Sequence, residues 1–248
     1  MTAREASSGT LYLIPVSFGD SEPAALLPPV TLAALRRLHY FVAENPKSAR
    51  RFLKAAGHPL PLQEIRIETL NEHTVAGALA RLLEPLLQGE DCGMLSEAGC
   101  PAIADPGTEL VRLAHEHEVH VVPLVGPSAI LLALMASGLN GQQFAFHGYL
   151  PVETERLRGR LRDLEEAAAR TGAAQIFIET PYRNSAMLRT LIETCRADTL
   201  LTIATELTLA GESIATRTIA GWKKKPPHLE RRPTVFVLGF AGRMPGKT

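Results

Sequence analysis

The sequence predicts an α/β protein of two domains, the first built on a parallel sheet and the second on a mixed sheet. In residues 1–123, short apolar runs alternate with helical patterns, which is typical of a parallel sheet covered by helices on both faces. After Pro123 the alternation changes, and the last two strand patterns have no helical pattern between them. At 248 residues, the chain is long enough for two domains with cores of their own.

The first domain, residues 1–123, is expected to contain five strands, each a short apolar run. They are Thr10–Pro15, Tyr40–Glu44, Glu64–Ile67, Cys92–Ser96 and Val119–Pro123. Helical patterns lie between them, at Thr31–Leu38, Ser48–Ala56, Thr74–Leu87 and Glu109–Glu118. The third of these helices has apolar residues spaced along one face, and we expect that face to be core.

The second domain, residues 124–248, begins with further alternation of helix and strand. The expected helices are Ser128–Ser137, Glu153–Arg170 and Asn184–Arg196, and the expected strands among them are Phe144–Leu150, Gln175–Glu179 and Thr199–Glu206. Two further strands, Ser213–Ala220 and Thr234–Phe240, follow without an intervening helix. We expect these two to form an antiparallel pair in a mixed sheet.

The charges balance, with 26 acidic and 26 basic side chains. Because proteins dedicated to non-specific nucleic-acid binding are usually basic, any contact with RNA would have to be local. The three cysteines lack Cys-x-x-Cys spacing, which favours a reducing compartment. Met1–Ser8 is polar, and no apolar run approaches the ~18 residues of a membrane helix, so we expect a cytoplasmic protein with no membrane association.

Three histidines, His115, His117 and His120, gather at the end of a predicted helix. Two of them could share a helix face, as metal-binding pairs do. No further ligand pattern completes a zinc site, and cationic side chains are common at helix ends. We therefore expect no bound metal.

The stretch Gly93–Gly107 is the most informative motif of the chain. It starts as a buried strand and continues in small residues with two prolines before a helix begins near Glu109. Such a loop lets backbone N–H groups approach a ligand, and open α/β sheets bind small molecules at the carboxyl ends of their strands. It matches neither the phosphate-binding P-loop nor the dinucleotide fingerprint. A plain strand-to-helix connection is the alternative.

A second segment of this kind is Val121–Ile130, in which a strand is followed by a Gly-Pro-Ser turn and an apolar helix. Pro127 suits a helix start, and Ser128 can accept a hydrogen bond from a free amide there. A capping motif alone is therefore the alternative. The two loops together indicate one divided pocket.

Seven short motifs follow one another along nearly the whole chain. They are Gly9–Pro15, Ala43–Glu44, Leu95–Gly107, Gly126–Ala129 with Ala136–Leu139, Phe146–Pro151, Ile176–Arg183 and Ala204–Thr208. In this order and spacing they resemble the tetrapyrrole (corrin/porphyrin) methylase superfamily. Within it, the chain most resembles the branch of ribosomal small-subunit RNA methyltransferase I, as a divergent member.

Several positions depart from the pattern of that branch. Glu44–Lys47 stands where the family has Glu-Asp-Thr-Arg, and Glu97 and Cys100 replace the Asp and Thr of its main loop. Thr205 replaces the Arg before Glu206, and the Lys-x-x-Glu-Glu stretch beyond it is absent. The changes lie mostly where we expect substrate, and they leave the predicted cofactor site intact.

The resemblance implies a methyltransferase that uses S-adenosylmethionine (SAM), bound in a cleft between the two domains. The residues implied to bind SAM are Pro15, Ser96, Gly99, Cys100, Ile103, Ser128, Ala129, Glu179 and Ala204. For Glu179 the alternative is a purely local role, in which its carboxylate bonds the amides of its own turn.

The nearest branch implies methylation of ribosomal RNA on a ribose 2′-hydroxyl. A base is useful for such an acceptor, and the candidates are Glu44, Glu97 and Glu206. Arg183 could hold a substrate anion, or it could pair with Glu179. A basic run, Lys223, Lys224 and Lys225 with Arg231 and Arg232, is either a solvated hairpin loop or a phosphate-binding segment.

Two other functions stay open at this point. One is methylation of a tetrapyrrole or another small molecule on the same scaffold, which the neutral charge permits. The other is a non-catalytic SAM-binding protein, which the altered substrate motifs permit. The resemblance also implies a homodimer, with ribosomal RNA or the small ribosomal subunit as a partner.

Overall fold

The computed structural model describes residues 8–71 and 74–240. The chain divides into two compact units, Met1–Ser128 and Ala129–Thr248, called unit 1 and unit 2 below. The boundary expected at residues 123 and 124 falls inside unit 1. In the described part of the chain, no helix is long and apolar enough to cross a membrane.

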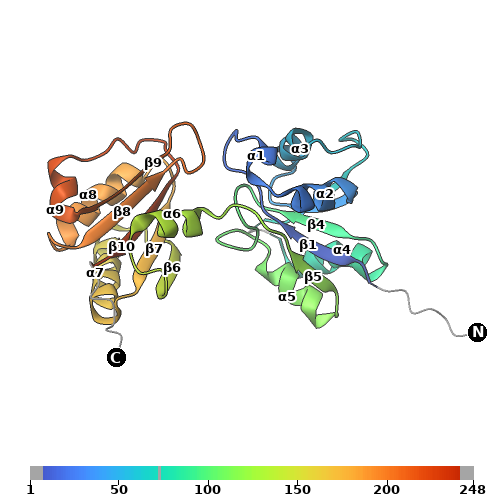
Figure 1. The fold of residues 1–248 in the computed structure, drawn as a ribbon. Helices are drawn as coiled ribbons and strands as arrows, with labels where there is room; N and C mark the ends of the chain where they lie inside the picture. The colour runs from blue at the N-terminus through green and yellow to red at the C-terminus, as the bar shows by residue number, and fades with distance from the viewer. Residues whose placement is uncertain (1–7, 72–73, 241–248) are drawn as a thin grey trace, which may run out of the picture. The chain divides into compact units, whose positions relative to one another are not determined.

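Unit 1 is built on a parallel sheet of five strands (Figure 1). The strands are β1 (Thr10–Ile14), β2 (Tyr40–Ala43), β3 (Arg66–Thr69), β4 (Cys92–Leu95) and β5 (His120–Pro123). Their order across the sheet is β3-β2-β4-β1-β5, and every neighbouring pair is parallel. The predicted parallel sheet is confirmed, although β3 begins two positions later than expected, at Arg66.

Helices cover both faces of this sheet, because successive side chains of a buried strand point to opposite sides. Tyr40 and Phe41, neighbours in β2, belong to two different buried clusters. Leu35 and Leu53 pack in the cluster of Phe41, whereas Leu83 packs in that of Tyr40. The helices of unit 1 are α1 (Pro23–Leu26), which the sequence analysis missed, α2 (Pro29–Arg37), α3 (Pro46–Ala55), α4 (Ala76–Leu87) and α5 (Thr108–Glu116).

Unit 2 contains a mixed sheet of five strands in the order β6-β7-β10-β8-β9. The strands are β6 (Phe144–Tyr149), β7 (Ala174–Glu179), β8 (Leu200–Thr205), β9 (Ser213–Thr218) and β10 (Thr234–Gly239). β6 and β7 are parallel, and the other neighbouring pairs are antiparallel. This confirms the predicted mixed sheet.

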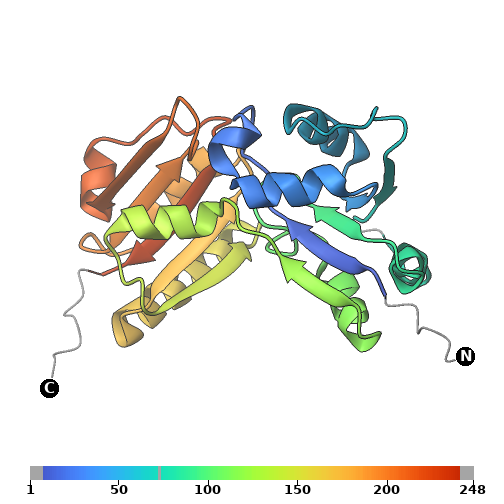
Figure 2. The same ribbon diagram turned by 45° about the vertical axis from the view of Figure 1, so that its right-hand side comes forward.

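The helices of unit 2 are α6 (Ala129–Ser137), α7 (Thr154–Thr171), α8 (Asn184–Thr194) and α9 (Ile219–Lys224). Figure 2 shows α6 lying across one face of the sheet. Thr216 of β9 donates a hydrogen bond to the carbonyl of Ser137 in α6, 2.7 Å away. On the other face, Leu161 of α7 and Leu191 of α8 are fully buried in one cluster with Phe236 of β10.

The prediction that the last two strands pair with each other is wrong. β10 lies between β7 and β8, and α9 separates it in sequence from β9. All six residues of β10 are buried, which is typical of a central strand with both faces covered. α9 begins where Thr218 accepts a hydrogen bond from the N–H of Gly221 at 3.1 Å, and it buries Ile219 and Trp222.

The expected hairpin loop at the basic run is also wrong. Lys223 and Lys224 form the last turn of α9, and Lys225 is its C-cap. Cationic side chains at this end of a helix interact favourably with its dipole. All three lysines are exposed to solvent.

Replacement of Phe236 by alanine tests the core of unit 2. Phe236 is fully buried, and its ring stacks on that of Phe177 with centroids 5.5 Å apart. We expect Phe236→Ala to lower the free energy of unfolding of unit 2 by about 3–5 kcal/mol, because the substitution leaves a cavity. Urea unfolding followed by the fluorescence of Trp222, the single tryptophan, measures this. Phe144→Ala on partly exposed β6 is the control, and an equal loss in both variants would contradict the expectation.

Candidate functional site

Three loops of unit 1 leave the same edge of its parallel sheet. They follow the carboxyl ends of β1, β4 and β5, and they contain Pro15, Ser96 and Ser128. Since β1 lies between β4 and β5, the three loops emerge from adjacent strands. Ligands of open α/β sheets bind at this edge.

Direct contacts hold these loops together. The N–H of Val16 donates to the carbonyl of Gly99 at 2.8 Å, and the N–H of Gly99 donates to the carbonyl of Val16 at 2.9 Å. The thiol of Cys100 donates to the carbonyl of Pro127 at 3.5 Å. Gly126 lies so close to Pro15 that a side chain at position 126 would collide with the proline ring. The structure therefore brings three of the predicted site residues, Pro15, Gly99 and Cys100, into adjoining loops of unit 1.

The loop after β4 has a backbone suited to binding a polar or anionic group. Gly99 has a φ of +77°, and Ala102 and Ala104 have φ values of +63° and +62°. Within the described residues, the backbone N–H groups of Ala102 and Ala104 donate to no backbone carbonyl. Backbone amides in left-handed turns form concave anion-binding sites. Ile103 lies between them with half of its surface exposed, so an apolar contact is available beside the polar one.

Carboxyl groups gather at the same edge of unit 1. Glu97 accepts a hydrogen bond from the hydroxyl of Ser48. Asp105, which the sequence analysis did not single out, is a further member of the group. Burial, with repulsion from Glu44 and Glu97, raises the pKa of Asp105 from 3.8 to about 6. In the sequence, Asp105 is marked only by being an acidic residue in a loop of small residues.

The cysteine at this edge is not set up as a nucleophile. Burial raises the pKa of the Cys100 thiol, which disfavours the reactive thiolate. In residues 8–71 and 74–240, no group of three or more His, Cys, Asp or Glu side chains is arranged to hold a metal ion.

Three predicted cofactor residues, Ala129, Glu179 and Ala204, belong to unit 2. Ala129 begins α6, and Ala204 is buried in β8. Glu179 ends β7 with its side chain buried; one carboxylate oxygen accepts the N–H of Thr180 at 2.7 Å, and the other lies 3.1 Å from the guanidinium of Arg183. Both local alternatives from the sequence, turn bonding and pairing with Arg183, are therefore present in the structure.

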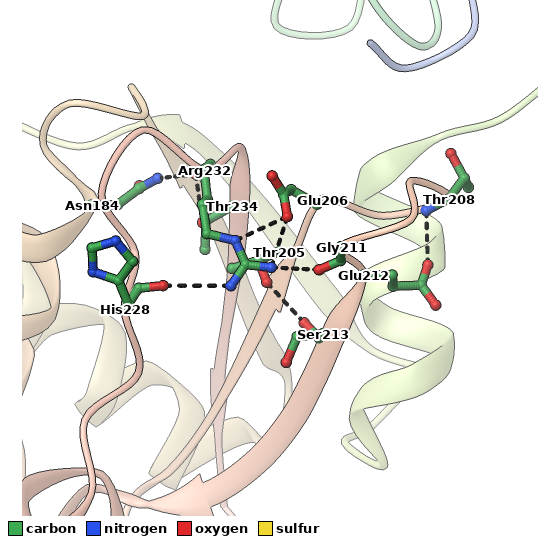
Figure 3. A network of polar contacts seen from close by, with 10 residues as sticks. All are labelled: Asn184, Thr205, Glu206, Thr208, Gly211, Glu212, Ser213, His228, Arg232 and Thr234. Atoms are coloured by element: carbon green, nitrogen blue, oxygen red, sulfur yellow. Dashed lines mark hydrogen bonds and ion pairs between the residues drawn. The ribbon is translucent and has the colours of Figure 1, made fainter. Parts of the chain in front are cut away.

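Arg232 organises the loop that follows β8 (Figure 3). Its guanidinium donates to the carboxylate of Glu206 at 2.8 and 3.0 Å and to the carbonyl of Gly211. Glu206 and Thr208 have φ values of +49° and +66°, a conformation that costs free energy for residues with side chains. The ion pair with Arg232 therefore holds a strained loop, and Glu206 is already engaged. The side-chain amide of Asn184 donates a hydrogen bond to the backbone carbonyl of Arg232, 2.6 Å away.

The sequence profile of one protein family, Tetrapyrrole (Corrin/Porphyrin) Methylases, matches residues 10–221. The chain belongs to this family. The match covers unit 1 with its loops and unit 2 as far as α9. It confirms the resemblance drawn from the seven motifs.

Individual relatives extend over most of the chain. The ribosomal RNA small subunit methyltransferase I of Xylella fastidiosa is 32% identical over 94% of this chain and 82% of its own length. The protein of the same name from Mesorhizobium japonicum is 34% identical over 84% of this chain and 67% of its own length. Among solved structures, the methyltransferase CobJ matches with a TM-score of 0.64 and 22% identity, over 94% of this chain and 95% of that one, which shows the common fold.

The family and these relatives establish the class of enzyme. The chain is a methyltransferase, and it works with a methyl-donor cofactor. The loops after β1, β4 and β5 fit such a group, because they offer amide donors, an exposed isoleucine and a backbone without bulky side chains at position 99.

The carboxyl group of Asp105 makes the stability of the protein depend on pH. The folded-state pKa is raised, so ionisation of Asp105 costs stability as the pH rises from 3.8 to about 6. Asp105→Asn removes that cost, and we expect the variant to have a higher Tm than the parent above pH 6 and no such gain at pH 4. Thermal unfolding at both pH values measures this. Asp163→Asn on the exposed surface of α7 is the control, and a gain of equal size at pH 4 would contradict the expectation.

Removal of the Arg232 side chain tests the strained loop. Arg232→Ala leaves Glu206 without its ion pair and the carbonyl of Gly211 without its donor. We expect a loss of about 1–3 kcal/mol in the free energy of unfolding of unit 2, the range for hydrogen bonds to charged groups. Lys224→Ala, which removes an exposed cation from α9, should leave the stability unchanged. Equal urea midpoints for Arg232→Ala and the parent would show that the loop holds its conformation without the pair.

Proposed function

We propose that the methyl donor is SAM and that the acceptor is ribosomal RNA of the small subunit, methylated on a ribose 2′-hydroxyl. The observation that carries the proposal is the similarity to the Xylella fastidiosa enzyme named ribosomal RNA small subunit methyltransferase I, over 94% of this chain. The shared length includes the loops at the carboxyl edge of unit 1. A cytoplasmic location follows from this acceptor.

In this proposal, the loops of unit 1 bind the donor. SAM supplies a methyl group bound to a sulfonium, which a nucleophile displaces in line. The amides of Ala102 and Ala104 would donate to polar groups of the cofactor, and Ile103 would contact an apolar part of it. Gly99 and Pro15 border the site through their backbone, and the bonds between Val16 and Gly99 keep the two loops in register. Such alignment can contribute on the order of 7 kcal/mol to lowering the barrier.

A carboxylate at this edge accepts the proton of the hydroxyl in the proposed reaction. Glu206 is paired with Arg232, and Glu97 accepts a hydrogen bond from Ser48. We assign the role to Asp105, because burial and the charges of Glu44 and Glu97 raise its pKa. A carboxyl group with a pKa of about 6 is ionised at neutral pH and more basic than an ordinary carboxylate. Glu44 and Glu97 oppose its charge, which strengthens it as a proton acceptor.

We further propose that the protein is a homodimer. α6 is apolar along its whole length, and Leu131 and Met135 expose half or more of their surface. Light scattering at micromolar concentration is expected to give twice the chain mass of 26.9 kDa. Leu131→Gln combined with Met135→Gln should shift the mass towards the monomer, and a monomeric parent would contradict the proposal.

Binding of SAM should stabilise the protein. At a hundredfold excess over its dissociation constant, a ligand adds about 2.7 kcal/mol to the free energy of unfolding. A thermal scan with SAM or its demethylated product measures this shift. Ile103→Gln changes an exposed side chain at the proposed site and should weaken SAM binding without altering the fold, whereas Val152→Gln, at a still more exposed residue of unit 2, should leave SAM binding unchanged. No shift at millimolar SAM would contradict the proposed donor.

Methyl transfer tests the acceptor. We expect labelled SAM to methylate small ribosomal subunits that lack the modification, and the label to appear in 2′-O-methyl nucleosides after digestion. Asp105→Asn should lower kcat by at least about a hundredfold, the usual contribution of a general base, while SAM binding is retained. Label in a tetrapyrrole panel and none in RNA would overturn the proposed acceptor.

A further inference from the structure

A pocket in unit 2, separate from the loops of unit 1, has no role in the function proposed so far. β8 and β9 form its floor, and α9 with the chain that follows it forms its wall. α9 packs against both β9 and α8. We refer to the pocket as the β9 pocket; the residues used below are Ser213, Ala215, Arg217, Trp222, Lys225 and Arg232.

The β9 pocket is strongly cationic. Three of its side chains carry positive charge, those of Arg217, Lys225 and Arg232, and no carboxylate side chain lines it. Glu206 neutralises Arg232 through their ion pair. Among the residues that the structure describes, neither Arg217 nor Lys225 takes part in an ion pair, so two cationic groups are available to a ligand.

The cation at position 217 is held in place by an aromatic ring. The guanidinium carbon of Arg217 lies 4.7 Å from the centre of the Trp222 ring, a distance typical of cation–π contacts. The indole itself is fixed, because its N–H donates to the carbonyl of Leu201 at 2.7 Å and only 3% of the residue is exposed. Arg217 is therefore oriented before any ligand arrives, which reduces the entropy lost on binding.

The remaining walls are neutral and suit a ligand with an apolar part. Ala215 and two prolines give an apolar surface, and Ser213 adds a hydroxyl. A planar guanidinium with fixed orientation recognises phosphate through two parallel hydrogen bonds, and an ammonium adds a point charge. The combination fits a phosphate ester with a flat organic group attached.

We propose that the β9 pocket binds the phosphate of a nucleotide unit, with Arg217 and Lys225 as its ligands. The inference rests on the proposed function in so far as the nucleotide belongs to substrate RNA. A free nucleotide carries the same chemistry, and the experiment separates the two sources. Phosphate binding was one of two interpretations of the basic run that contains Lys225. The pocket keeps Lys225 from that run and adds Arg217, whereas Arg232 is already paired with Glu206.

Trp222 makes the pocket directly observable, since it is the single tryptophan and lines the site. Titration of the full chain with a short single-stranded RNA, with adenosine monophosphate and with inorganic phosphate is expected to change its fluorescence. Anisotropy of a labelled RNA gives a second readout, which is needed because substitution of Arg217 also alters the surroundings of the indole.

The variants are Arg217→Gln and Lys225→Gln, with Lys223→Gln as the matched control. All three positions are exposed and lose one positive charge, but Lys223 does not line the pocket. We expect each pocket variant to weaken RNA binding about tenfold, since hydrogen bonds to charged groups contribute at least that factor. Each should also reduce the log–log salt slope by about one unit. The control should match the parent in affinity, and all three should keep the parent's Tm.

The outcomes distinguish this inference from the proposed function. Binding of RNA that depends on Arg217 and Lys225 supports the pocket with RNA as its ligand, and binding of the mononucleotide alone supports it with a free nucleotide. Equal affinity in the parent and both pocket variants overturns the inference, even if small ribosomal subunits are methylated. Conversely, phosphate binding at the pocket without any methylation of the subunits would overturn the proposed acceptor and leave the pocket standing.

Discussion

The reciprocal hydrogen bonds between Val16 and Gly99 are the constraint on which the rest of the site depends. β1 and β4 are neighbours, and their register ends with Ile14 opposite Leu95. Beyond that pair the two chains leave the sheet, and without a further link their loops would be free to separate. The two bonds between residues 16 and 99 close the gap and fix where the loop of small residues starts. The positions of Ala102 and Ala104, and of Asp105 behind them, follow from that starting point.

In unit 2, an ion pair of Arg232 fixes the loop after β8. This loop is irregular, and the guanidinium of Arg232 bonds both Glu206 and Gly211, in addition to the backbone hydrogen bonds of the loop (Figure 3). This use of Arg232 has a consequence for the charge distribution. A cation that is paired with Glu206 is not available to bind a substrate. The basic residues of this region are therefore of two kinds, paired and unpaired, which the sequence cannot separate. Among the residues that the structure describes, Arg217 and Lys225 belong to the unpaired kind.

Much of the fold was predictable because its signals are local. A short apolar run such as Cys92–Leu95, followed by small residues, predicts a buried strand and the loop after it without reference to the rest of the chain. The position of β10 was not predictable in this way, because strand order depends on contacts between distant segments. Its uninterrupted apolar composition was nevertheless a sign of a central strand, and neighbouring strands in sequence were given too much weight. α9 escaped prediction because it has only six residues.

The site was predictable as a set of loops and less so as a set of roles. Sequence motifs indicated Pro15, Gly99 and Cys100, and the structure places them in adjoining loops of unit 1. They could not indicate Asp105, whose raised pKa depends on its burial and on two carboxylates, Glu44 beyond β2 and Glu97 in its own loop. They also could not separate a carboxylate that is free to act from one already bonded, as Glu206 is to Arg232.

Hydrogen exchange with and without SAM tests the central claim, that the loops at the carboxyl edge of unit 1 hold the methyl donor. We expect slower exchange of backbone amides in residues 96–107 when SAM is bound, with smaller effects in residues 16–18 and 124–128. Amides of Ala102 and Ala104 should show the largest change, because within the described chain they have no backbone acceptor of their own. Binding of SAM that leaves the exchange of residues 96–107 unchanged would contradict the claim.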